Sequence, residues 1–258
     1  RDGRPEAAIV NFGLHPAILA GDNWLYSADF PGQLAEALSR TVGDHFTSIF
    51  LNGCCGNVNH VDYREPRQGR GYQMTQRVGY VLGAAVHQAI NKRSAVQADC
   101  VAVSSQKVSF DRIQISEDER ARCQTVMAAA AGARPKGKVH RLPDAFFAGL
   151  RLVMHAQQDK PDDVALMTLR SAGVAVVGLP GESFCETGIQ IKRRSTAAHP
   201  RGAGLSNDAV GYPPTRDSYN HGGYETTVGS TVYQPGTAVR LGEASLELFG
   251  SAGQGVRG

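Results

Sequence analysis

The sequence predicts an α/β protein with a mixed β-sheet core flanked by helices, folded as a single large domain. Short apolar segments of strand length alternate with longer segments whose apolar residues recur every three or four positions, as on one face of a helix. Polar clusters follow several of the strand-like segments, which is typical of sites at strand ends in open α/β sheets. The chain has 258 residues, of which 41% are hydrophobic, so it can bury one core of ordinary size.

Composition and charge argue against several function classes. The formal net charge is +3 and no long basic run occurs, so the chain lacks the electrostatic footprint of a nucleic-acid-binding protein. No apolar stretch reaches the roughly 18 residues of a membrane-spanning helix. The five cysteines are odd in number and include the neighbours Cys54 and Cys55, so they do not outline a disulfide framework. The tight basic cluster at 192–194 is expected at the C-terminal end of a helix.

The first half of the chain alternates strands and helices. The strand-like runs are short and apolar, and each leads into a polar segment: the first into His15 and Pro16, the second into a glycine-rich turn at 52–57. The expected elements are a strand over 7–14, a loop over 16–30, a helix over 31–42, a strand over 47–51 and a helix over 73–92.

The second half adds a hairpin and further helices. Ser116 with Glu119 three residues later resembles a capping box, and Ser-Ala-Gly at 171–173 is a tight-turn signature between two strands. The expected elements are a strand over 99–110, a helix over 117–131, an exposed basic excursion over 132–144, strands over 164–170 and 174–179, a helix over 183–195, a short strand over 203–207, a long loop over 208–236 and a helix over 237–250. The domain is expected to span residues 1–250, followed by a loose tail at 251–258.

Three strand ends carry residues capable of chemistry, namely His15, the turn at 52–63 and Glu182. The turn gathers two glycines, three asparagines, two cysteines, His60 and Asp62 into twelve residues. A purely structural turn rarely needs so many polar side chains, although glycine and asparagine also suit the backbone of a tight turn.

Structural interpretations stand beside the functional ones. His15 could be a packed imidazole, and Ser27 or Asp29 could cap the following helix. Glu182 could favour the positive end of a helix, and Tyr212 could anchor the long loop. Each residue taken alone fits its structural interpretation.

In combination, these segments resemble the catalytic domain of neutral, non-lysosomal ceramidases. That family carries Asn-aromatic-x-x-His-Pro after a strand, Ser-Gly-Asp before a helix, a glycine turn containing a serine, Pro-Gly-Glu at a helix start, and tyrosines near the C-terminal helix. The corresponding segments here are Asn11–Pro16, Ser27–Asp29 with Gly32, Cys55–His60, Pro180–Glu182, Leu205–Asn207, Tyr212, Tyr219 and Tyr224–Glu225. Because their order and rough spacing agree over nearly the whole chain, we expect a divergent, bacterial-type relative.

The resemblance implies a zinc-dependent hydrolase of amide bonds. In the family a histidine, a glutamate and a tyrosine bind one zinc ion, so His15, Glu182 and Tyr212 are the candidate ligands. Zinc would lower the pKa of a bound water and polarise the amide carbonyl. The implied substrate is N-acyl sphingosine or another N-acyl lipid or amino sugar. The implied location is secreted or periplasmic, with peripheral membrane contact.

The chain departs from the family pattern in two places. The family has a further zinc-binding histidine upstream of the segment matched by His15, so an N-terminal part of the domain is expected to be missing; His60 could substitute for that ligand. Asn59 stands where the family has a serine nucleophile. Asn59 could instead stabilise an oxyanion, while metal-activated water attacks with His60 or Asp62 as the base.

Three hypotheses therefore remain open. The first is the metal-dependent amide hydrolase, which requires its three ligands to converge on one point. The second is a non-catalytic relative that keeps the fold and binds a ligand or partner. The third is a cysteine-dependent hydrolase that uses Cys54 or Cys55 with His60, which requires an exposed thiol beside an imidazole.

Overall fold

A computed structural model describes residues 3–65, 67–98, 100–131, 143–159 and 163–251. Helices and strands alternate along the chain, which confirms the predicted α/β class. The elements are β1 Ala7–Phe12, α1 Asp29–Val42, β2 Thr47–Asn52, α2 Tyr72–Asn91, β3 Ala102–Ser109, α3 Glu117–Ala130, α4 Asp144–Gln157, β4 Asp163–Ser171, β5 Val174–Gly178, α5 Cys185–Arg194, β6 His199–Ala203, α6 Ser218–His221 and α7 Thr237–Ser251.

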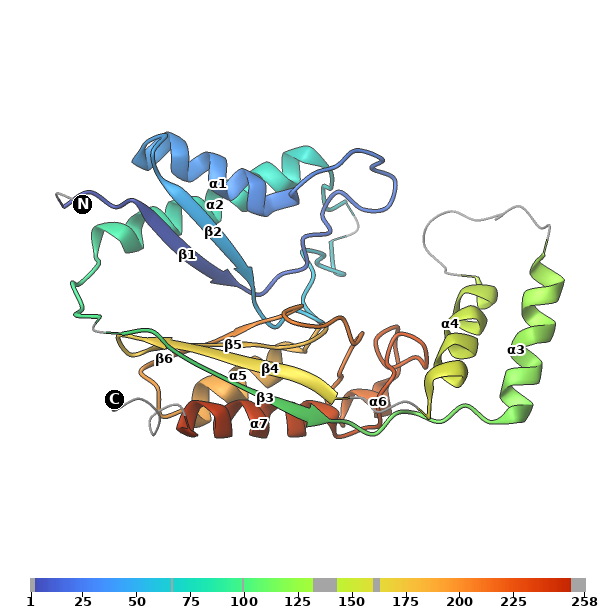
Figure 1. Ribbon diagram of the computed structural model, residues 1–258. Coiled ribbons are helices and arrows are strands. Elements are labelled where there is room, and N and C mark those ends of the chain that lie inside the picture. The colour runs from blue at the N-terminus through green and yellow to red at the C-terminus, as the bar shows by residue number, and fades with distance from the viewer. Residues whose placement is uncertain (1–2, 66, 99, 132–142, 160–162, 252–258) are drawn as a thin grey trace.

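The strands form two adjoining sheets. β1 and β2 pair in parallel, while β3, β4, β5 and β6 lie in that order, antiparallel except for the parallel β5–β6 pair. Helices α1 and α2 lie on one side of β1 and β2, and α5 and α7 cover the opposite side of the four-stranded sheet (Figure 1). The protein is therefore layered, with a different pair of helices covering each sheet.

Hydrogen bonds from the Asn11 side chain and from the Gly204 backbone amide join the two sheets. The Asn11 amide nitrogen donates to the Leu51 carbonyl at 3.1 Å and to the Gly202 carbonyl at 3.0 Å. The Gly204 N–H donates to the Asn52 carbonyl at 2.9 Å. These bonds join the ends of β1 and β2 to the end of β6, so the residues that follow all three strands lie close together.

Each sheet has its own hydrophobic core. The larger core lies between the four-stranded sheet and helices α5 and α7, and the smaller one lies between β1, β2 and helices α1 and α2. The larger core includes Val164, Leu166, Val177, Leu179, Ile191, Tyr233, Leu241 and Phe249. The smaller core is built from Val10, Leu34, Leu38 and Phe46.

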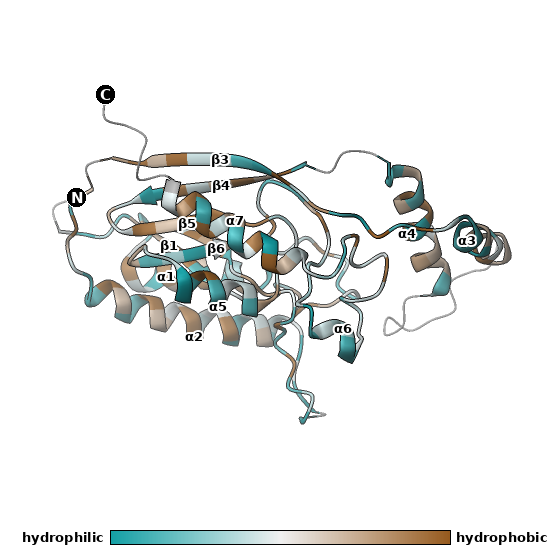
Figure 2. Ribbon diagram, turned by 90° about the horizontal axis from the view of Figure 1, so that it is seen from below, coloured by the Kyte–Doolittle hydropathy of each residue, from teal (hydrophilic) through white to brown (hydrophobic). Residues whose placement is uncertain are grey.

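Helices α3 and α4 form an arm that projects beyond the end of the sheet in both views (Figures 1 and 2). The sequence pattern predicts α3, and its Ser116 hydroxyl accepts a hydrogen bond from the Glu119 N–H as expected. It assigns no element to the residues of α4. The predicted excursion over 132–144 falls mostly outside the described residues.

Several predicted boundaries hold, one strand is misplaced, and the short helix α6 lies inside the segment predicted as a loop over 208–236. The hairpin of β4 and β5 turns at Ala172 and Gly173, both with positive φ, and the basic cluster at 192–194 ends α5. The last strand, however, is His199–Ala203 rather than 203–207. Its sequence, His-Pro-Arg-Gly-Ala, has no apolar alternation, and its position is fixed by parallel pairing with β5. The predicted tail at 251–258 lies outside the described residues, except for Ser251, which ends α7.

Within the described part of the chain, no helix combines the length and the apolarity needed to cross a lipid bilayer.

The contact between α1 and α2 depends on glycine. A Cβ at Gly79 would lie 2.8 Å from the backbone carbon of Gln33, and one at Gly83 would lie 2.9 Å from the Ala37 side chain. We predict that Gly79→Ala lowers the free energy of unfolding by about 1–3 kcal/mol, because the two helices must move apart. Urea unfolding followed by circular dichroism measures this.

Gly149→Ala in α4 is the matched control. A Cβ there would make only ordinary contact with Met127, at 3.8 Å. Since alanine favours a helix over glycine by about 1 kcal/mol, this variant should be as stable as the wild type or slightly more stable. Equal destabilisation by both substitutions would show that packing of α1 on α2 is not the cause.

Candidate metal centre

Three turns meet at the seam between the sheets. The turn after β2 contacts the segment after β5 through the Gly56 N–H, which donates to the Ser183 carbonyl at 2.9 Å. The Glu182 N–H donates to the Gly211 carbonyl at 2.9 Å, and the His15 N–H donates to the Val58 carbonyl at 3.1 Å. Backbone hydrogen bonds therefore bring together segments that are far apart in the sequence.

Glycine makes this approach possible. A Cβ at Gly56 would overlap the Glu182 carbonyl oxygen, and one at Gly181 would overlap the Gly211 carbonyl oxygen. Gly181 and Gly211 also have φ values of 68° and 70°, which L-residues with a side chain rarely adopt. The glycines of these turns thus set how closely the side chains beside them can converge.

His15 and Glu182 face each other in a largely buried position. The imidazole Nδ1 lies 3.4 Å from the Glu182 Oε2, with side-chain exposures of 14% and 23%. The other ring nitrogen, Nε2, lies 3.3 Å from the Gly56 carbonyl. A carbonyl can only accept, so this contact places a ring proton on Nε2. The other nitrogen, Nδ1, faces the carboxylate, where its lone pair could bind a cation.

Tyr212 completes the group. Its ring centroid lies 6.4 Å from that of His15, and the Glu182 carboxylate lies close enough to its hydroxyl to affect its pKa. Burial raises the pKa of the Tyr212 phenol, and the Glu182 carboxylate and the nearby Glu225 raise it further. The phenol is therefore protonated at neutral pH. The three candidate ligands lie near one another, and their binding to one metal ion stays a prediction.

The donor types fit a zinc ion, and so does the spacing of the His15 and Glu182 donors. Two donors on a tetrahedral zinc at about 2.0–2.2 Å are separated by about 3.3–3.5 Å, and the Nδ1–Oε2 separation is 3.4 Å. This is longer than the usual N–H···O hydrogen bond. Among the described residues, no group of three or more histidine, cysteine, aspartate or glutamate side chains is arranged to hold a metal. The fit thus depends on the phenol as third donor, and the metal roles stay predictions.

Asn57 anchors the turn, a role that the sequence analysis missed. Its side-chain oxygen accepts from the Cys185 N–H at 2.9 Å, and its amide nitrogen donates to the Glu186 carboxylate at 2.9 Å. Asn57 therefore satisfies the first turn of α5 from a distant part of the chain. No local sequence signal reveals a contact between residues 128 positions apart.

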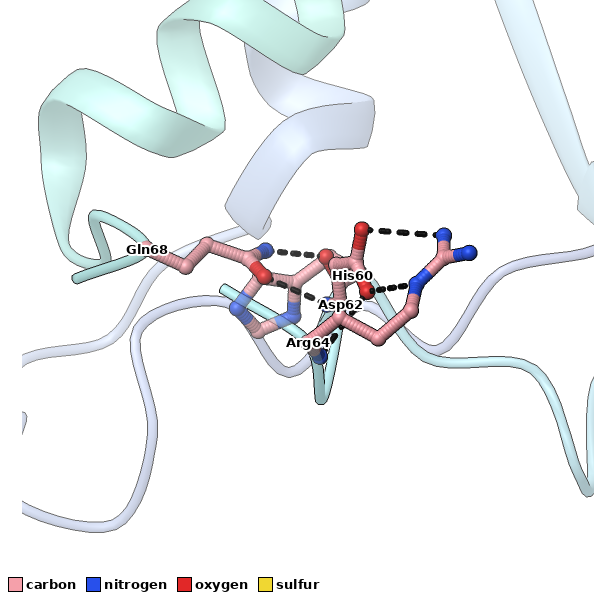
Figure 3. Close-up of polar contacts among 4 residues, drawn as sticks. All are labelled: His60, Asp62, Arg64 and Gln68. Atoms are coloured by element: carbon pink, nitrogen blue, oxygen red, sulfur yellow. Dashed lines mark hydrogen bonds and ion pairs between the residues drawn. The ribbon is translucent and has the colours of Figure 1, made fainter. Parts of the chain in front are cut away.

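The predicted catalytic residues Asn59, His60 and Asp62 lie on the exposed side of this turn. Asp62 is held by Arg64 at 2.9 Å, and Gln68 bonds both to the Asp62 N–H and to the His60 carbonyl (Figure 3). The guanidinium of Arg64 lowers the pKa of Asp62, which makes this carboxylate a weaker base.

His60 is partly buried. Burial lowers the pKa of the His60 imidazole, against the opposing charge of Asp29, so the neutral form is favoured. Its Nδ1 is buried without a hydrogen-bond partner. Within the described chain, neither His60 nor Asp62 bonds to His15, Glu182 or Tyr212. Their catalytic roles stay predictions, as does the role of Asn59.

The two adjacent cysteines are buried rather than exposed. Burial raises the pKa of Cys54 to about 12 and that of Cys55 to about 11. The imidazole near Cys55 is that of His15, with Nδ1 at 3.9 Å from the sulfur, and not that of His60. A thiol with such a pKa is a poor nucleophile at neutral pH, which argues against the cysteine-dependent hypothesis.

Comparison with solved structures identifies the fold. No family model matches the chain, and no curated protein matches it significantly. The neutral ceramidase from Pseudomonas aeruginosa is similar over 95% of this chain and 44% of its own, with a TM-score of 0.65 and 19% identity. A ceramidase complexed with C2 is similar over 95% of this chain and 45% of its own, with a TM-score of 0.65 and 17% identity.

These likenesses establish a ceramidase-like fold, in agreement with the resemblance found in the sequence. The chain spans less than half the length of either ceramidase. The expectation that an N-terminal part of the domain is missing, and the domain boundary at residue 250, stay predictions.

The thiols offer a direct test of the cysteine-dependent hypothesis. With a pKa of about 11, only about one Cys55 thiol in a thousand is ionised at pH 8, and the thiolate is the reactive form. We predict that iodoacetamide at pH 8 labels the exposed Cys100 and leaves Cys54 and Cys55 unmodified in the folded protein. Peptide mass spectrometry measures this. Rapid labelling of Cys55, with loss of activity, would revive the cysteine-dependent hypothesis.

Proposed function

We propose that the protein is a zinc-dependent hydrolase of an amide bond, acting on N-acyl sphingosine or another N-acyl lipid or amino sugar. One observation carries the proposal: the His15 Nδ1 lies 3.4 Å from the Glu182 Oε2, and the Tyr212 ring packs edge-on against that of His15 with centroids 6.4 Å apart. These groups come from three separate turns. The ceramidase-like fold supports the choice of an amide bond.

Each residue has a definite task in this scheme. His15 and Glu182 would hold the ion, with Tyr212 as third ligand; a bound zinc ion supplies an activated water and polarises the amide carbonyl. The Gly56 carbonyl orients the His15 ring through Nε2–H, an outer contact that zinc-binding histidines usually make. Burial keeps the Tyr212 hydroxyl protonated, so it can donate a hydrogen bond to a bound substrate.

An aromatic row beside the group supports an apolar substrate. The ring of Tyr212 lies 5.7 Å from that of Tyr224, which lies 6.2 Å from Phe147, which in turn lies 5.3 Å from Phe146. Tyr224 and Phe146 are exposed. Such a surface suits the acyl chain or the sugar ring of an amide substrate.

A second candidate function is a catalytically inactive, ceramidase-like domain that binds a ligand. The observation that favours it is Asn59, which stands where the resemblance places the family's nucleophilic serine and has no hydroxyl. The two candidates predict the same fold and differ in metal content and turnover.

Metal content separates them. We predict about one zinc per chain in the wild type, lost in His15→Ala and Glu182→Gln because each removes a donor from a three-ligand site. Hydrolysis of a chromogenic N-acyl substrate should fall at least about a hundredfold in both variants, since the loss of even outer-shell contacts costs about 10–100-fold. Elemental analysis and initial rates measure these effects.

His199→Ala is the matched control, because this histidine is exposed in β6 and belongs to no part of the group. It should keep both zinc and activity. A wild type that binds no zinc but still binds an N-acyl ligand would favour the inactive candidate. Zinc retained in His15→Ala and Glu182→Gln would contradict the assigned ligands.

A further inference from the structure

The loop that follows His15 presents large apolar side chains to solvent. Trp24 is 92% exposed and Leu25 70% exposed, and Tyr26 between them and the helix is fully exposed. Trp24 is the single tryptophan of the chain. Three consecutive residues of this kind at a loop tip are unusual on a protein surface and mark an interaction site.

Hydrogen bonds to Asp29 fix the base of this loop. The carboxylate of the buried Asp29 accepts from the Leu19 N–H at 3.0 Å and from the Phe30 N–H at 2.7 Å, which closes the base of the loop. At the tip, the Asn23 amide nitrogen donates to the Leu25 carbonyl at 2.9 Å. Ile18 and Leu19 in the same loop are buried. The base of the loop is therefore packed, and only its tip is exposed.

A neighbouring loop adds to this surface. Val61 is 59% exposed and Tyr63 is 91% exposed. The two loops are joined by the ion pair of Arg70 with Asp22 at 2.9 Å and by the Tyr72 hydroxyl, which donates to the Asn23 side chain at 3.3 Å. We call Trp24, Leu25, Tyr26, Val61 and Tyr63 the aromatic rim.

The two loops that carry the rim begin next to the candidate metal centre. Its first loop begins directly after His15, and its second continues the turn that contacts Glu182 through Gly56. Both loops therefore leave the sheet at the same edge as the three candidate ligands.

The rim carries no excess charge. Residues 20–28 and 60–70 contain three acidic and three basic residues, and Arg64 and Arg70 are already paired with Asp62 and Asp22. Attraction to anionic headgroups or to a strongly charged protein is thus not the driving force. Exposed tryptophan and tyrosine with aliphatic neighbours are typical of side chains at the boundary between headgroups and acyl chains.

We infer that the aromatic rim inserts into the surface of a zwitterionic lipid bilayer and so places the candidate site against the membrane. The choice of a lipid as the occupant rests on the proposed function, because an N-acyl lipid resides in a bilayer. Insertion itself needs neither zinc nor turnover, since none of the rim residues is a candidate ligand.

The single tryptophan reports on insertion directly. On titration with phosphatidylcholine vesicles that contain no amide lipid, the Trp24 emission should shift to shorter wavelength and the protein should sediment with the vesicles. The partition coefficient of Leu25→Ser/Tyr26→Ser, which keeps the reporter, should fall at least about tenfold because an apolar side chain no longer leaves water. Raising the salt concentration from 0.1 to 0.5 M, which shortens the screening length about twofold, should leave binding unchanged.

Val96→Ser is the matched control, because Val96 is 69% exposed after α2 and outside the rim; its binding should equal that of the wild type. All measurements are repeated in EDTA, so a failure of the zinc proposal leaves this test intact. The inference is overturned if Trp24 emission does not shift, if the double variant binds as well as the wild type, or if the emission is already blue-shifted without lipid in a dimer, which would assign the rim to a second copy of the chain.

Discussion

The close approach of three backbone turns is the constraint on which the rest of the structure depends. Gly56 meets the Glu182 carbonyl and Gly181 meets the Gly211 carbonyl at separations that leave no room for a side chain. The hydrogen bonds at these contacts are all backbone to backbone. The position of each candidate ligand is thus set by main-chain geometry, which is more rigid than a constellation of long side chains on separate loops.

The electrostatics of the group follow from this geometry. At the centre, the Nδ1 of His15 and the Oε2 of Glu182 face each other at 3.4 Å. Around them lie donors with raised pKa values, the Tyr212 phenol and the Cys55 thiol. Burial keeps the phenol and the thiol neutral, so the Glu182 carboxylate is the one negative charge among these four side chains. Such an arrangement favours a cation at the centre.

The sequence predicts the elements that have strong local signals. It does not predict elements whose position is set by strand pairing. Helices α2 and α7 follow from apolar periodicity, and α3 follows from its capping box, each within about two residues, the usual uncertainty of such boundaries. β6 was misplaced because His-Pro-Arg-Gly-Ala becomes a strand only beside β5. The identity of the candidate ligands came from the order of family motifs. Their convergence, and the bond from Asn57 to α5, are long-range facts that no local pattern encodes.

The two halves are joined at their seam by the hydrogen bonds of Asn11, Gly204, Gly56 and Asn57. His15 belongs to the two-stranded half, whereas Glu182 and Tyr212 belong to the four-stranded half. An ion shared by these residues would add a further link between the two halves. The two halves would then unfold more cooperatively, because neither half could unfold without releasing the ion.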